Sequence, residues 1–274
     1  MCVTCGCGDE AGTRITDVSG QQRAHGQVNG HDHDHDHDHD HDHDHGDGHS
    51  HAPAGKSTRT VLLEQQVLAK NDGLATDNRA WLEQRQLVAV NLMSSPGAGK
   101  TTLLERTIRE LGEQVPVSVI EGDQETLFDA DRIRAAGSRV VQINTGQGCH
   151  LDADMVGSAL RTLDPPNASV VFIENVGNLV CPALFDLGED NKVVIMSVTE
   201  GADKPLKYPH MFRAADVVLL NKIDLLPYVD FDVDRFLSDV ATINPQVEVL
   251  QLSATTGAGM QAWYDRLTRQ LAAA

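Results

Sequence analysis

The chain has 274 residues and carries 40 acidic against 22 basic side chains, a formal net charge of −18 at pH 7. This length allows one large domain or two small ones with a buried core. The negative charge argues against nucleic acid as the main partner, because the negatively charged protein and nucleic acid would repel each other. No basic-then-apolar leader and no run of about 20 apolar residues occurs, so we expect a cytoplasmic protein that does not span a membrane.

Composition divides the chain near residue 58. Residues 1–58 hold 11 acidic and 3 basic side chains, 11 of the 13 histidines and few large apolar residues. Such a segment cannot bury enough surface to offset its conformational entropy. Residues 59–274 carry a net charge of −10 and have an ordinary globular composition. We therefore predict a disordered metal-binding tail over 1–58 and a folded domain over 59–274 that begins with a helical segment.

Three cysteines lie within the first seven residues, with glycines beside them: Cys2, Cys5 and Cys7. Glycine permits the tight backbone that would bring three thiolates onto one ion. Cytosolic cysteine clusters bind metal more often than they form disulfides. A planar nitrogen and sulfur set would suit nickel, whereas a tetrahedral set would suit zinc. The alternative is a frayed terminus with incidental thiols.

Histidine and aspartate then alternate without a break from residue 31 to residue 45. In an extended conformation the imidazoles would share one face and the carboxylates the other. Imidazole binds nickel, copper and zinc, and the carboxylates would offset the charge of a bound cation. A solvated polar tether is the alternative. The composition favours a weak nickel store, with ligands His31, His33, His35, His37, His39, His41, His43 and His45.

After residue 59 a stretch of helical spacing runs through Trp81, and short β-branched runs then alternate with helical stretches. This pattern is typical of an α/β fold with a mostly parallel sheet flanked by helices. In such sheets, ligands bind beyond the carboxyl ends of the strands. We predict strands over 87–93, 117–120, 140–143, 170–173, 193–198, 217–220 and 247–252.

The first predicted strand runs into Ser-Ser-Pro-Gly-Ala-Gly-Lys-Thr-Thr at 94–102, and a helix follows. Backbone N–H groups of such a loop cradle phosphate oxygens, Lys100 would reach the β- and γ-phosphates, and Thr101 would bind Mg²⁺. Ser94 stands where the general consensus has glycine. The predicted phosphate-binding residues are Gly97, Ala98, Gly99, Lys100, Thr101 and Thr102.

A later strand ends in Asn-Lys-Ile-Asp at 221–224. The Asp224 carboxylate can accept two N–H bonds from guanine, and adenine lacks that donor pair. The stem of Lys222 would pack over the purine, and the loop after the last strand would place an N–H group near the guanine O6. The nucleotide is therefore predicted to be GTP, with base-recognition residues Asn221, Lys222, Asp224, Ser253 and Ala254.

Two further strand ends are candidates for sensing the γ-phosphate. Asp123 is placed to bind Mg²⁺, Glu174 to bind Mg²⁺ or its waters, and the Gly177 N–H group to contact the phosphate. The alternative is that the acids cap the helices that follow. No glutamine or arginine is evidently placed for catalysis, so we expect slow hydrolysis. The predicted catalytic residues are Lys100, Thr101, Asp123, Glu174 and Gly177.

A second metal site is predicted at the same sheet edge. Cys149 and His150 follow the third strand, and Cys181 follows the fourth. Sulfur and nitrogen donors of this kind suit nickel or zinc. Because three donors leave a tetrahedral site incomplete, water, a carboxylate or a second subunit in a symmetric dimer would complete it. The alternative is that both cysteines are small buried apolar side chains.

Taken together, these residues resemble the HypB-type GTPases that insert nickel during maturation of nickel–iron hydrogenases, within the SIMIBI class of P-loop GTPases. The resemblance covers nearly the whole chain. It rests on the cysteine start, the histidine-rich tract and the runs at 94–102, 121–124, 144–152, 174–182, 199–201, 203–209 and 221–224.

This resemblance implies a homodimer that delivers Ni²⁺ to the hydrogenase large-subunit precursor. It also implies a HypA-type zinc- and nickel-binding accessory protein and often a nickel-binding prolyl isomerase as partners. By the same resemblance, Cys2, Cys5 and Cys7 would form a high-affinity nickel site. Cys149, His150 and Cys181 would form a weaker nickel or zinc site that is linked to the nucleotide.

Two other functions fit part of the sequence. A urease-type nickel-insertion GTPase shares the histidine-rich tail and the phosphate loop, but the three-cysteine start and the Gly-Cys-His-Leu-Asp run at 148–152 favour the hydrogenase branch. A nickel buffer would explain the tract, whereas the complete set of guanine motifs argues against storage alone.

Overall fold

The computed structural model describes residues 14–17, 58–123, 128–146 and 148–274. Eight strands form one sheet in the order β1-β4-β3-β5-β2-β6-β7-β8. All neighbours are parallel except β1, which is antiparallel to β4. The strands are β1 (Arg14–Asp17), β2 (Val88–Ser94), β3 (Val117–Asp123), β4 (Arg139–Asn144), β5 (Val170–Glu174), β6 (Asn191–Ser197), β7 (Val217–Asn221) and β8 (Glu248–Gln251).

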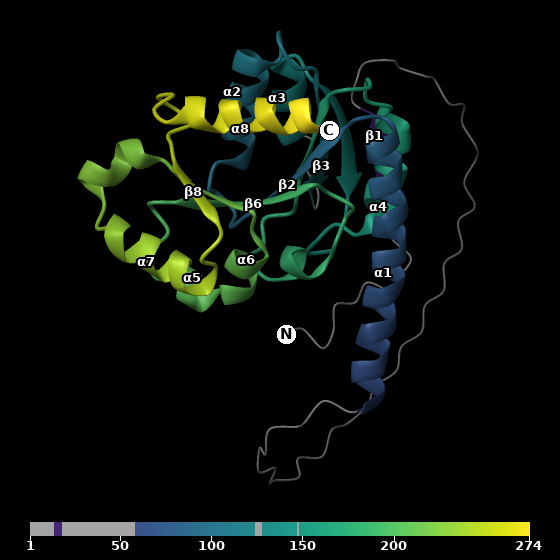
Figure 1. Ribbon diagram of the computed structural model, residues 1–274, viewed down its shortest axis with the longest axis horizontal. Helices are drawn as coiled ribbons and strands as arrows, with labels where there is room; N and C mark the ends of the chain where they lie inside the picture. Colours follow the sequence, from purple (N-terminus) through teal and green to yellow (C-terminus); the bar gives the residue numbers. More distant parts are fainter. Residues whose placement is uncertain (1–13, 18–57, 124–127, 147) are drawn as a thin grey trace, which may run out of the picture.

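Helices cover both faces of the sheet, which confirms the predicted fold class (Figure 1). One face packs against α2, α3 and α8, whereas the other packs against α1 and α4 at one end and α6 and α7 at the other. The helices are α1 (Thr58–Gln84), α2 (Lys100–Leu111), α3 (Phe128–Ala135), α4 (Ala153–Leu163), α5 (Lys204–Lys207), α6 (Pro209–Ala214), α7 (Val233–Ile243) and α8 (Met260–Ala273), with 3₁₀ turns η1 (Cys181–Leu184) and η2 (Ile223–Tyr228).

The central strands are apolar on both sides because both faces are covered. In β2, Val90 and Leu92 contribute to the core under α2 and α8, whereas Ala89 and Met93 contribute to the opposite face. Every residue of β2 is buried. This rigid strand ends at Ser94, so the phosphate loop that follows it starts from a fixed point.

The prediction that the whole tail is disordered is wrong for the four residues of β1. Residues 14–17 were expected to be disordered, but they pair with β4 from Arg14 opposite Asn144 to Asp17 opposite Val141. Ile15 packs against the core beneath α1 and α4. Four residues with one apolar side chain are too short to show a strand pattern in the sequence. Cys2, Cys5, Cys7 and the histidines from 31 to 45 lie outside the described residues.

Within the described ranges, no helix combines the length and the apolar character that crossing a lipid bilayer requires.

Two glycine-to-alanine substitutions should change the stability of the protein in opposite directions. Gly259 has φ of +72°, and an added Cβ would overlap the carbonyl oxygen of Gln251. Gly259→Ala should therefore destabilise the protein by about 1–3 kcal/mol. Gly73 is exposed within α1, and an added Cβ there meets nothing within 4 Å. Gly73→Ala should stabilise the helix by roughly 0.5–1 kcal/mol.

Urea denaturation followed by circular dichroism measures both changes. Equal effects of the two alanines would contradict this description of the loop before α8.

Candidate functional site

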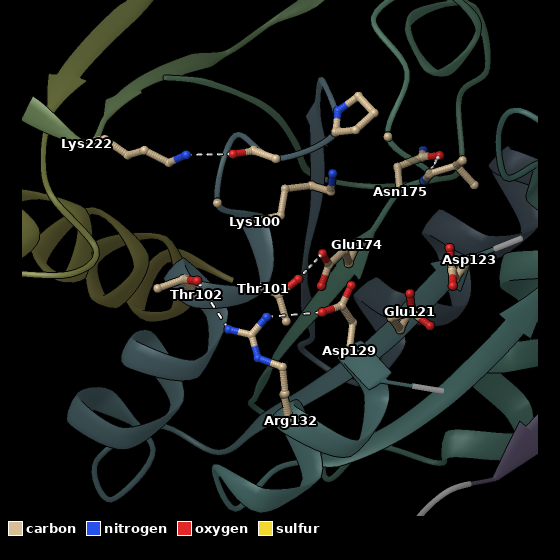
Figure 2. Close-up of a pocket in the computed structure, with 16 residues that line it drawn as sticks. Lys100, Thr101, Thr102, Glu121, Asp123, Asp129, Arg132, Glu174, Asn175 and Lys222 are labelled. Atoms are coloured by element: carbon tan, nitrogen blue, oxygen red, sulfur yellow. Dashed lines mark hydrogen bonds and ion pairs between the residues drawn. The ribbon is translucent and has the colours of Figure 1, made fainter. Parts of the chain in front are cut away.

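A pocket of about 550 Å³ lies at the carboxyl ends of β2, β3 and β5 (Figure 2). The loop between β2 and α2, the ends of β3 and β5, and the start of α3 line it, together with Lys222. This is the position where parallel α/β sheets bind ligands. Of the residues predicted to recognise the base, only Lys222 lines this pocket, so the pocket corresponds to the phosphate part of the site.

The phosphate loop requires glycine at two positions. Gly97 and Gly99 have φ of +76° and +101°, and a Cβ on Gly99 would lie 2.7 Å from Asn221 Nδ2. That same Asn221 nitrogen donates a hydrogen bond to the Ala98 carbonyl oxygen (3.0 Å), and Lys222 Nζ donates to the Gly97 carbonyl oxygen (2.7 Å). Asn221 and Lys222, at the end of β7, therefore hold the phosphate loop in position through these hydrogen bonds.

Ser94, the departure from the general consensus, has a role in this geometry. Its backbone is not among the positive-φ positions, so glycine is not needed there. Its hydroxyl accepts a hydrogen bond from Lys100 Nζ (2.8 Å) and donates to the Ser95 carbonyl oxygen (2.6 Å). Burial lowers the pKa of Lys100, and the nearby carboxylates, Glu174 first, oppose this shift.

Four carboxylates line the pocket: Glu121, Asp123, Asp129 and Glu174 (Figure 2). Thr101 Oγ1 donates to Glu174 Oε1 (2.9 Å). Glu174 Oε2 and Glu121 Oε2 are buried and have no hydrogen-bond partner among the described residues. Burial raises the pKa of Glu174 to about 7, and burial together with the charge of Glu174 raises that of Glu121 to about 9. Such hard oxygen donors fit Mg²⁺.

Four polar residues that line the pocket have no role assigned from the sequence: Glu121, Asp129, Arg132 and Asn175. One arginine, Arg132, lines the pocket, although the sequence shows no arginine evidently placed for catalysis. The Arg132 guanidinium bonds Thr102 Oγ1 (3.2 Å), Glu105 (2.8 Å) and Asp129 (3.2 Å). Hydrogen bonding to Glu105 raises the pKa of Arg132. Glu121 and Asn175 lie close in sequence to the predicted Asp123 and Glu174, whereas Asp129 and Arg132 reach the pocket because α3 follows the end of β3.

The predicted base-recognition residues lie around Asn221. Its Oδ1 accepts hydrogen bonds from the Lys222 N–H (2.8 Å) and the Ala254 N–H (3.1 Å), so it holds the last loop in place. The Ser253 N–H donates to the Ala258 carbonyl oxygen (2.8 Å). Asp224, in η2, has a buried Oδ1 without a partner in the described part of the chain. A buried carboxylate oxygen of this kind calls for an N–H donor from a ligand.

The loop after β5 lies directly against the phosphate loop. A Cβ added to Gly177 would come within 3.0 Å of Pro96 Cγ and 3.2 Å of its backbone nitrogen. Glycine is therefore needed for this close approach, and Gly177 lines the pocket.

Cys149, His150 and Cys181 come together at the same sheet edge. The two sulfurs are 3.0 Å apart, Cys149 Sγ is 3.6 Å from His150 Nδ1, and one ligand atom from each residue lies within 4.8 Å of the others. All three side chains are half-buried. The His150 ring stacks on Phe185, with centroids 4.0 Å apart. Burial lowers the pKa of His150, which favours the neutral ring that binds metal ions.

A phosphate loop at the end of a buried central strand, with carboxylates opposite it, defines a P-loop nucleotide-binding protein. The family model described as "CobW/HypB/UreG, nucleotide-binding domain" matches residues 88–251. The chain is 58% identical over 219 residues to "Hydrogenase maturation factor HypB" of Azotobacter vinelandii (80% of this chain, 72% of that one). It is 53% identical to the protein of that name from Escherichia coli K12 (80% and 76%).

Two solved structures are similar. HypB from Archaeoglobus fulgidus matches with a TM-score of 0.70 and 42% identity, covering 74% of this chain and 100% of that one. HypB from Helicobacter pylori in complex with nickel matches with a TM-score of 0.70 and 36% identity, covering 74% and 95%. The chain therefore belongs to the CobW/HypB/UreG family, and within it to the HypB hydrogenase maturation factors.

The raised pKa of Glu121 predicts how stability depends on pH in the nucleotide-free protein. Between pH 5 and 9 the native state retains a proton that the unfolded chain releases near pH 4.5, so the free energy of unfolding should fall as pH rises. Glu121→Gln should flatten this decline by roughly 1 kcal/mol or more, since each unit of pKa difference is worth about 1.4 kcal/mol.

Urea denaturation at pH 5, 7 and 9 measures the slope. Glu113→Gln, at an exposed loop position, is the matched control. Parallel profiles for the two variants would contradict the assignment.

Proposed function

We propose that this protein is a GTPase that carries Ni²⁺ to the hydrogenase large-subunit precursor in the cytoplasm. It works as a homodimer with a HypA-type accessory protein and a nickel-binding prolyl isomerase. The family membership supports the role in hydrogenase maturation. The cargo is supported by the sulfur and nitrogen donors of the site and by the nickel complex of the Helicobacter pylori relative.

The observation that carries the proposal is that two loops serve both sites. The loop after β4 bears Cys149 and His150, and its Thr145 N–H donates to the Asp123 carbonyl oxygen (2.9 Å). The loop after β5 bears Gly177 and, four residues later, Cys181. Movement of either loop toward a γ-phosphate would change the spacing of the metal ligands, so GTP and nickel should affect each other's binding.

The residues at the pocket fit GTP hydrolysis with Mg²⁺. Thr101 and Asp123 would hold the ion, with Glu174 beside Thr101, and Mg²⁺ would supply charge neutralisation of the phosphates. Lys100 brings a further positive charge, and the Gly177 N–H is placed to bind the γ-phosphate. Arg132 is occupied by Glu105 and Asp129, so we propose slow intrinsic hydrolysis.

The metal ligands are one donor short of a tetrahedral set, which supports a dimer that completes the site. Val180 and Leu184, on either side of Cys181, are 42% and 49% exposed, and apolar side chains of this kind favour a protein contact. The same donors would also accept Zn²⁺. Outside the described residues, Cys2, Cys5 and Cys7 would form the tighter nickel site and the histidine tract a store.

Nickel affinity tests the central claim. In the chain lacking residues 25–51, exchange of GDP for a non-hydrolysable GTP analogue should change the affinity for the second nickel equivalent by about 5-fold or more. Cys149→Ala should abolish this change because it removes a ligand from the core site. Competition with a colorimetric chelator measures both. Identical nickel affinity with the two nucleotides would contradict gated delivery.

Base selectivity tests the role proposed for Asp224. Asp224→Asn should weaken GDP binding by about 100-fold or more, because one acceptor of the guanine N–H pair becomes a donor. The same change should strengthen xanthosine diphosphate binding, since the new N–H₂ group can donate to the xanthine O2. Competition with a fluorescent nucleotide gives both affinities. Asp230→Asn, at an exposed position after η2, should change neither.

A further inference from the structure

Asn175 is a buried residue directly after β5 whose side chain joins three parts of the site. Its Oδ1 accepts hydrogen bonds from the Leu151 N–H (3.3 Å) and the Val176 N–H (3.0 Å). Its Nδ2 donates to Asn91 Oδ1 (3.2 Å). Asn175 is 1% exposed and lines the pocket beside Glu174 (Figure 2).

Each of these partners belongs to a different functional element. Leu151 follows Cys149 and His150 in the loop after β4, which we call the metal loop. Val176 precedes Gly177 in the loop after β5, which faces the phosphate part of the pocket. Asn91 lies on β2, the strand that carries the phosphate loop. One carboxamide therefore connects the metal ligands, the γ-phosphate loop and the central strand.

The connection is held firmly at the central strand. Asn91 is fully buried, and its Nδ2 donates to Glu189 Oε1 (3.0 Å). The other Glu189 oxygen accepts the Leu187 N–H (2.6 Å). The Asn175 backbone N–H also donates to the Leu92 carbonyl oxygen (3.0 Å).

The metal loop is also held from the side of β3. Leu151 is fully buried, and a Cβ on Gly122 would come within 2.9 Å of both its methyl carbons. Gly122 directly precedes Asp123. Leu151 therefore lies between the end of β3 and the Asn175 side chain. Because one peptide bond joins Leu151 to His150, a displacement of β3 or of Asn175 would also displace His150.

We propose that Asn175 is the positioning residue that couples nucleotide state to the geometry of the Cys149, His150 and Cys181 site. If the loop at Gly177 moves toward a γ-phosphate, the Asn175 carboxamide moves with it. Leu151 then either follows, or its buried N–H group loses its hydrogen bond, which costs free energy. This inference rests on the proposed function, since it names the residue through which that gating acts.

The chain offers a matched control in α1. Asn78 Nδ2 donates to the Ala153 carbonyl oxygen (2.7 Å) and to the Leu187 carbonyl oxygen (3.0 Å). It is a buried asparagine whose two hydrogen bonds hold the first residue of α4 and the segment before β6, and it does not line the nucleotide pocket. Asn78→Ala therefore removes comparable bonds without breaking the link.

The test uses the full chain with Mg²⁺ held constant. A fluorescent GDP and a fluorescent non-hydrolysable GTP analogue are titrated with and without saturating NiCl₂. The coupling factor is the change that nickel causes in the ratio of the two affinities, and by linkage it equals the effect of nucleotide on nickel. Cys149→Ala supplies the baseline, because it retains the tail but lacks the core site.

We expect a coupling factor of about 5 or more in the wild type and within about 2-fold of unity in Asn175→Ala. Asn78→Ala should retain the wild-type factor, because the hydrogen bonds of Asn175 remain in place. An undiminished factor in Asn175→Ala, or loss in Asn78→Ala to the same extent, would overturn the role of Asn175. No coupling in the wild type would instead count against the proposed function.

A second measurement needs no variant, in case Asn175→Ala does not fold. Hydrogen exchange of the Leu151 amide in the wild-type full chain should differ by about 10-fold or more between the GDP and GTP-analogue forms. Equal protection in the two forms would contradict the proposal.

Discussion

Parallel strands of one sheet finish at the same edge, so every loop that follows them has to share that edge. Here the shared edge brings together a phosphate loop from β2, carboxylates from β3 and β5, and candidate metal ligands from the loops after β4 and β5. The loops have little room to move independently, as the contact of Gly177 with Pro96 shows. The coupling proposed between the nucleotide and the metal ion would follow from this crowding.

Electrostatics of the pocket follow from the same crowding. Burial raises the pKa values of Glu121 and Glu174 above those of ordinary carboxyl groups, and burial of Lys100 lowers its pKa. The protein without ligands thus keeps carboxyl groups in a place where they resist ionisation. A nucleotide that binds with a cation would change that balance, because the cation would supply positive charge beside the two carboxylates.

Much of the fold and part of the site could be predicted from the sequence. The phosphate loop, Asp224 and the strands are read from local patterns, since apolar runs and glycine spacing are properties of contiguous residues. Arg132 and Asn175 could not be identified in this way, because their roles depend on where α3 and β2 lie relative to them. β1 escaped prediction because Arg14–Asp17 contains a single apolar residue, and its pairing with β4 is a long-range contact.

The direction of β1 has a consequence for the distance between the cysteine start of the chain and the domain. Since Arg14 pairs with Asn144 at the carboxyl end of β4, β1 begins at the sheet edge that holds Cys149 and His150. Six residues lie between Cys7 and Arg14 in the sequence, which makes a tether of at most about 25 Å. A tether this short gives the cysteine motif a high effective concentration at that edge.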